Sequence, residues 1–107
     1  MAIKIDLSLS NKDLYRGCDI VDVAGRATLV TPTSFAKQVV GRNIENLLDA
    51  IPQQDRDSVT LSGPMAIWAY LVVFHAVLHK FTCIYYDDGK PTGPELIAAH
   101  GPISPPA

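Results

Sequence analysis

The sequence predicts an α/β protein in which one sheet carries two main helices. The chain has 107 residues, which suits a single domain with a modest core. Its composition, with 48% hydrophobic and 19% charged residues, is typical of a globular protein. Its β-prone and helix-periodic segments alternate along the chain, which favours an α/β sandwich. We expect this domain over residues 1–100, followed by a proline-rich, frayed tail at residues 101–107.

The first half of the chain is expected to contain strands followed by a helix. Ile3–Leu9 alternates apolar and polar residues, as a half-buried strand does. Two short β-prone runs, Asp19–Val23 and Arg26–Val30, flank Gly25, which fits a hairpin or a bulged strand. Apolar residues then recur at helical spacing from Phe35 to Ile51.

The second half is expected to form a compact βαβ unit. Ser58–Ser62 and Phe81–Tyr86 are the two strands, and Met65–Leu78 is a strongly apolar helix between them. At 14 residues that helix is too short to span a bilayer, which needs about 20. It is therefore interpreted as a buried helix that crosses a sheet. Glu95–His100 is expected to add a final short strand.

Charge and cysteine usage exclude several classes of function. The formal net charge is -2, whereas a protein that binds duplex DNA through its phosphates is normally far more basic. Cys18 and Cys83 lack the spacing of metal ligands and are interpreted as reduced core residues. Lys4 and Asp6 interrupt the first apolar residues, so no signal peptide is predicted and the cytoplasm is the expected location.

Two segments are candidates for chemistry, because ligands of α/β sheets gather where strands end and helices begin. Ser62-Gly63-Pro64 lies between a strand and the apolar helix, and it suits either a phosphate pocket or an ordinary βα turn. Asp87 and Asp88 follow the next strand and precede Lys90. Such carboxylates can hold a divalent metal or act as a base, with the alternative of a solvated acidic turn.

The histidines add candidates for metal binding and proton transfer. His75 and His79 are four residues apart and share a helix face, which is a spacing that can ligate a metal. His75 also suits a satisfied core histidine, whereas His79 at the helix end is the better acid or base. His100 could reach the same edge of the sheet as the acidic turn at Asp87 and Asp88. The chain shows neither a Ser–His–Asp order nor a P-loop, so triad hydrolases and nucleotide triphosphatases are not supported.

In order along the chain, these residues resemble a small CRISPR-associated family, the Csx-three group, which is the third class of ring nucleases. The similarity covers Ser58 to His100 and rests on Ser62-Gly63, Trp68, His79, Asp88, Lys90 and His100. The resemblance implies a compact Rossmann-like fold, related to the CRISPR-associated Rossmann fold, and a dimer that can stack further around its ligand. It also implies cleavage of cyclic tetra-adenylate in type III CRISPR defence, stimulated by Mn²⁺.

The resemblance also implies the roles of individual residues. His79 would be the acid or base, Asp88 would orient it or hold the metal, and Lys90 would offset phosphate charge. The ligand-binding residues would be Ser62, Gly63, Pro64, Trp68 and His100. The metal candidates His75 and Asp87 come instead from the histidine spacing and the acidic turn described above.

Several alternatives remain open from the sequence alone. Asp87 replaces Asp88 as the counterpart if the helix carries no extra residue relative to the family, and Lys90 stands where the family has Arg. A sensor that binds cyclic oligoadenylate without cleaving it is the alternative function. A structural subunit with no nucleotide site, whose apolar helix packs in an interface, is the third interpretation.

Overall fold

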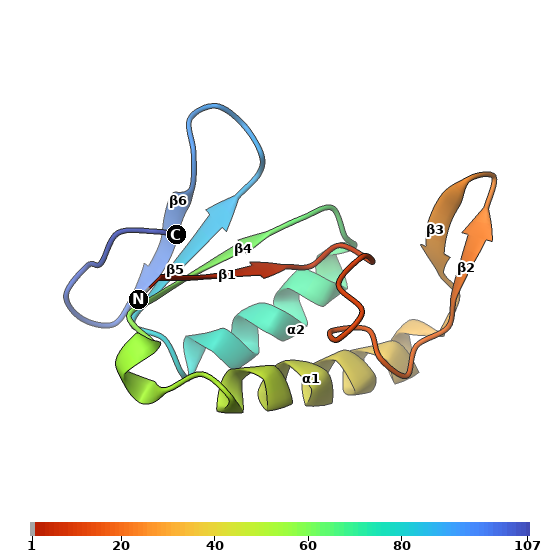
Figure 1. Cartoon of the computed structure of the whole chain (residues 1–107), viewed down its shortest axis with the longest axis horizontal. Helices are drawn as coiled ribbons and strands as arrows, with labels where there is room; N and C mark the ends of the chain where they lie inside the picture. Colours follow the sequence, from red (N-terminus) through yellow and green to blue (C-terminus); the bar gives the residue numbers. More distant parts are fainter. Residues whose placement is uncertain (1) are drawn as a thin grey trace.

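A computed structural model describes residues 2–107 and shows an α/β fold with two layers (Figure 1). One layer is a four-stranded sheet in the order β1-β4-β5-β6. Both main helices lie on the same face of that sheet (Figure 1). The expected α/β class is therefore confirmed. The elements are β1 (Ala2–Asp6), β2 (Ile20–Val23), β3 (Arg26–Leu29), α1 (Thr33–Asp49), the 3₁₀ turn η1 (Gln53–Asp55), β4 (Ser58–Ser62), α2 (Ile67–Leu78), β5 (Cys83–Asp87) and β6 (Glu95–Ala99).

The strand order explains why both helices cover one face. β1 pairs with β4 and β4 pairs with β5, both in parallel, and β6 closes the sheet antiparallel to β5. The two parallel crossovers step in the same direction across the sheet. Crossovers of the same hand that step in the same direction place their helices on the same side. The βαβ unit expected from β4, α2 and β5 is confirmed.

The core lies between the sheet and the helix layer. Val59, Leu61 and Ile84 point from the central strands into this core. α1 contributes five buried residues at helical spacing, and α2 contributes four small or branched ones. The buried residues of the helices are Ala36, Val39, Val40, Ile44 and Leu48 of α1, and Ala69, Val73, Ala76 and Val77 of α2.

Most element boundaries differ from the sequence prediction by one to three residues, and two of the shifts have a clear local cause. β1 ends at Asp6 rather than Leu9, because the Asp6 carboxylate accepts hydrogen bonds from the Ser8 N–H (2.8 Å) and hydroxyl (2.9 Å). This local bonding turns the chain out of the sheet. α2 begins at Ile67 rather than Met65, because Ala66 still has an extended backbone. No helix among residues 2–107 is long and apolar enough to cross a membrane.

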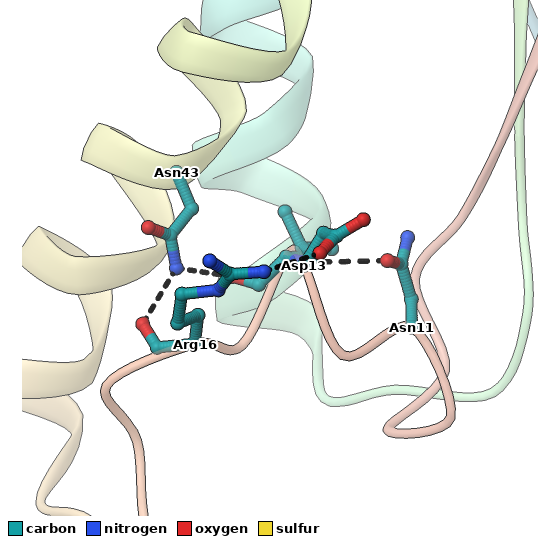
Figure 2. A network of polar contacts seen from close by, with 5 residues as sticks. Asn11, Asp13, Arg16 and Asn43 are labelled. Carbon is teal, nitrogen blue, oxygen red and sulfur yellow. Dashed lines mark hydrogen bonds and ion pairs between the residues drawn. The ribbon is translucent and has the colours of Figure 1, made fainter.

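The loop between β1 and β2 is fixed to α1 by side-chain amides (Figure 2). The Asn43 amide on α1 donates to the carbonyls of Leu14 and Arg16, each at 2.8 Å. The Asn11 side chain accepts from the Leu14 N–H at 3.3 Å. These bonds hold Leu14 and Tyr15 in the core, where both are buried. The loop is therefore an ordered part of the helix layer.

The expected hairpin is confirmed, and it stands apart from the sheet (Figure 1). β2 and β3 pair antiparallel and are joined by Ala24-Gly25. Both turn residues have positive φ, 53° and 79°, as the tightest hairpin turns require.

The tail at residues 101–107 lacks regular structure, but the expectation that it is frayed is wrong. Its carbonyl oxygens accept hydrogen bonds from the Ser58 and Tyr85 hydroxyls, both at 2.8 Å. Its Ser104 N–H donates to the Cys83 sulfur at 3.4 Å. These partners occupy the sheet face opposite the helices, so the tail covers part of that face. Cys83 is buried and Cys18 half-buried, and both are free thiols.

Candidate ligand site at the carboxyl edge of the sheet

The two candidate segments of the sequence meet at the carboxyl ends of the parallel strands. Ser62 and Asp87 are register partners at the ends of β4 and β5. The chain beyond them lines a cavity of about 330 Å³. Its lining residues are Lys4, Ser62, Gly63, Pro64, Tyr86, Asp87, Asp88 and Gly89. Parallel neighbours end at the same edge, which is why residues 25 positions apart converge here.

The turn at Gly63 is shaped by the chain's own packing. Gly63 has a φ of +98°, and a Cβ there would collide with Asp6 Oδ1 and lie 2.9 Å from the Ser8 nitrogen. The Gly63 carbonyl also accepts a hydrogen bond from the Tyr70 hydroxyl on α2. These contacts support the interpretation of Gly63 as a conformational requirement of a βα turn. Gly63 still forms part of the cavity wall.

Charged groups of both signs surround the cavity. Asp87 Oδ1 accepts the Gly89 N–H at 2.8 Å, and its Oδ2 lies 3.8 Å from the Lys4 ammonium. Asp88 Oδ1 accepts the Lys90 N–H at 2.9 Å, and its Oδ2 lies 3.7 Å from the Lys90 ammonium. Each carboxylate therefore has one lysine as a partner. These long ion pairs at the surface are weak, so an incoming anion can compete for the lysines.

Lys4 is a lining residue that the sequence did not predict. It lies in β1, which pairs with β4, and its side chain reaches the end of β5 across that strand. The alternation of apolar and polar residues in β1 is the sequence feature that points to Lys4, because it places Lys4 and Asp6 on the same sheet face. The strand order needed to bring Lys4 to Asp87 is not encoded in that local pattern.

The predicted catalytic histidine lies at the end of the sheet that is opposite the carboxyl-edge cavity. His79 caps the C-terminus of α2, which runs back from the carboxyl edge to the start of β5. The expected grouping of His79 with Asp88 and Lys90 is therefore not formed within one chain. His100 is also distant from the cavity, because its N–H donates to the Thr82 carbonyl (2.8 Å) just before β5.

His75 and Trp68 also differ from their predicted places. His75 is exposed rather than a core residue, and its ring lies 4.9 Å from that of His79, between centroids. It lines a second cavity between α1 and α2, so His75 and Asp87 do not form a joint metal site in one chain. Trp68 is half-buried and packs against the core, and it is absent from the lining of the carboxyl-edge cavity.

The carboxyl-edge cavity has hard oxygen donors for a divalent cation, but not a complete set. Asp87 and Asp88 supply carboxylate oxygens, which suit Mn²⁺. Among residues 2–107 there is no group of three or more His, Cys, Asp or Glu side chains that could hold a metal ion. The two carboxylates therefore fit a cation only if other ligands, such as phosphate oxygens, complete its coordination.

Comparison with known proteins finds no match to a family model, to a curated protein or to a solved structure. The geometry of the carboxyl-edge cavity is therefore the basis for assigning a function.

Proposed function

We propose that this protein binds a cyclic oligoadenylate, with cyclic tetra-adenylate as the expected ring, at the carboxyl edge of its sheet. The observation that carries the proposal is the convergence of Ser62-Gly63-Pro64, Asp87-Asp88 and Lys4 around one cavity of about 330 Å³. Parallel α/β sheets bind nucleotides at this edge. We include in the same proposal that this fold is related to the Rossmann fold.

The cavity offers the interactions that a phosphodiester needs. Lys4 in its lining, and Lys90 just beyond the lining residues Asp88 and Gly89, provide positive charge, and both are held by carboxylates only at 3.8 and 3.7 Å. The Ser62 hydroxyl provides a donor at the end of β4. Asp87 and Asp88 would hold a bound Mn²⁺, whose role is to offset charge on the phosphate. These residues account for binding and orientation of the ring backbone.

Cleavage is proposed to require more than one copy of the chain. An RNA phosphodiester is cut when its own 2′-hydroxyl attacks the adjacent phosphorus in line and the 5′-oxygen leaves. A base must accept the hydroxyl proton and an acid must protonate the leaving oxygen. His79 can serve here only from a second copy, because its own chain holds it at the far end of α2. Stacked dimers would bring the carboxyl edge of one copy to the His79 end of another and form a ring nuclease in the cytoplasm.

The separation of His79 from Asp88 specifically favours one alternative, a sensor that binds the ring without cleaving it. Incubation of the purified protein with cyclic tetra-adenylate, with and without Mn²⁺, distinguishes the two functions. Linear products support the nuclease, whereas tight binding without products supports the sensor. Absence of both binding and cleavage would overturn the proposal.

A matched pair of lysine variants tests the location of the site. Lys4→Ala is expected to weaken binding of cyclic tetra-adenylate by roughly tenfold or more, because it removes a charge-assisted contact to phosphate. Lys37→Ala removes an equal charge from an exposed position of α1 and should leave the affinity unchanged. Calorimetry at low salt measures both. Equal affinities for the two variants would remove the carboxyl-edge cavity from the binding site.

A further inference from the structure

A pair of histidines forms a second feature of the molecule, away from the carboxyl edge. His75 and His79 are exposed side chains one turn apart on α2. Their ring centroids are 4.9 Å apart, with an angle of 67° between the ring planes. Residues at this spacing project from the same face of a helix, so both imidazoles are available to one bound group.

The two rings line a cavity of about 300 Å³ between α1 and α2. α1 contributes Gly41 and Glu45 to its wall. Because Gly41 has no side chain, that part of α1 adds no bulk, and Glu45 adds a carboxylate to the lining. The cavity therefore contains two imidazoles and one carboxylate, which are all metal-ligand types.

The charges around this cavity favour a cation. Glu45 Oε2 lies 3.4 Å from the Lys80 ammonium, and Asp49 Oδ1 lies 3.6 Å from the same group. One lysine is thus shared by two carboxylates, so this group of three side chains carries a net negative charge. A divalent ion beside Glu45 would relieve this imbalance, whereas an anion would be repelled.

We propose that His75 and His79 bind a divalent transition-metal ion of the zinc class, with Glu45 as a supporting carboxylate. Imidazole nitrogens suit Zn²⁺, Ni²⁺ and Cu²⁺, whereas Mn²⁺ and Mg²⁺ prefer oxygen ligands. Residues 2–107 contain no preassembled set of three ligands, so water or a rotated Glu45 completes the coordination. This site uses neither Asp87 nor Asp88, but it shares His79 with the proposed cleavage step, so a zinc-bound His79 would not act as its acid or base.

Titration with Zn²⁺ alone, followed by competition with a zinc indicator dye, tests the proposal. The wild-type chain should bind one Zn²⁺ and should be stabilised against thermal unfolding, because the ion binds the folded state. Loss of a supporting group around a metal costs about 10–100-fold in affinity, so loss of a direct ligand should cost at least about 100-fold. His75→Ala and His79→Ala should each show this loss, and Glu45→Gln a smaller one.

His100→Ala is the matched control, because His100 is exposed but lies outside this cavity. It should bind Zn²⁺ as the wild type does, and replacing Zn²⁺ with Mn²⁺ should abolish binding at the pair. Zinc affinity unchanged in both His75→Ala and His79→Ala, or absent in the wild type, would overturn the proposal. Because no nucleotide is present, these outcomes are independent of whether the chain binds cyclic oligoadenylate.

Discussion

Gly63 occupies a position where both the backbone conformation and the packing require glycine. Its φ of +98° strains any residue with a Cβ, and the added atom would collide with Asp6 Oδ1. Gly63→Ala is therefore expected to lower the free energy of unfolding by about 1–3 kcal/mol from backbone strain, with a further loss from displacing Asp6. Urea denaturation measures the change.

Gly89→Ala is the matched control for this prediction. Gly89 has a similar φ of +83°, but a Cβ there would meet no atom of residues 2–107 within 4 Å. The difference between the two variants therefore separates the clash with Asp6 and the Ser8 nitrogen from the backbone strain. Equal destabilisation would show that the turn at Asp6 moves aside with no further loss in the free energy of unfolding.

Tyr70 links the cavity wall to stability at alkaline pH. Burial raises the pKa of Tyr70 from 10.0 to about 12, and the neighbouring Tyr86 adds to the rise. The folded state thus holds the phenol proton where the unfolded chain has released it. The resulting stability is complete below pH 10 and is lost as the pH rises towards 12. Denaturation at a series of alkaline pH values should show this fall.

Tyr70→Phe should flatten that part of the pH dependence, because it removes the titrating hydroxyl. At neutral pH the variant should lose about 1 kcal/mol, the usual net contribution of one hydrogen bond, here to the Gly63 carbonyl. A pH profile with the same slope in both proteins would mean that Tyr70 is not the group responsible.

Individual residues differ in how far their roles could be predicted from sequence. Ser62 and Asp87 were predictable, because a βαβ unit places the ends of its strands side by side. Lys4 was not, because its contact with Asp87 depends on which strand β1 joins. Proximity in sequence wrongly predicts that His79 lies near Asp88 in space. The twelve-residue α2 carries it to the other end of the sheet.

Among the elements, the tail at residues 101–107 was the least predictable. Its prolines indicate the absence of regular structure, and the tail indeed has none. Its anchors, however, are side chains of Ser58 and Tyr85, which lie 47 and 19 residues from their tail partners. Local patterns contain no information about such distant pairs. The helices and the four sheet strands, by contrast, follow from periodicity and turn residues, with shifts only at their ends.

Removal of residues 101–107 should destabilise the chain without unfolding it. The deletion leaves the Ser58 and Tyr85 hydroxyls without their carbonyl partners, and each lost bond costs about 1 kcal/mol when water can replace it. We therefore expect a loss of roughly 2 kcal/mol in the free energy of unfolding. Circular dichroism should show an unchanged secondary structure, and urea titration should show the loss.

Ser58→Ala in the full-length chain is the partial control, because it removes only one of the two hydroxyl bonds. Its effect should be about half that of the deletion if the bonds act independently. A deletion variant as stable as the full-length chain would show that the tail does not contribute to stability.

At the scale of the whole molecule, the two candidate sites lie at opposite ends of the α/β layers. The carboxyl-edge cavity is lined by Asp88, and the α1–α2 cavity is lined by His79. A nuclease site that needs both residues must therefore combine the carboxyl edge of one copy with the helix end of another. A head-to-tail contact would do this, and so would a twofold contact in which the carboxyl edge of each copy meets the helix end of its partner.

This geometry makes a prediction about mixtures of inactive variants. His79→Ala removes the proposed acid or base, and Asp88→Asn removes the proposed catalytic carboxylate, so each variant alone should lose at least about 100-fold in cleavage rate. In an equimolar mixture, some contacts pair the intact edge of the first variant with the intact His79 of the second. Random pairing of copies should restore roughly a quarter of the wild-type rate. Product formation from cyclic tetra-adenylate, measured at increasing protein concentration, provides the readout.

The double variant His79→Ala/Asp88→Asn, mixed with wild type to the same total concentration, controls for dilution. A mixture no faster than its components would contradict a site shared between copies, and would favour a sensor that binds the ring without cutting it.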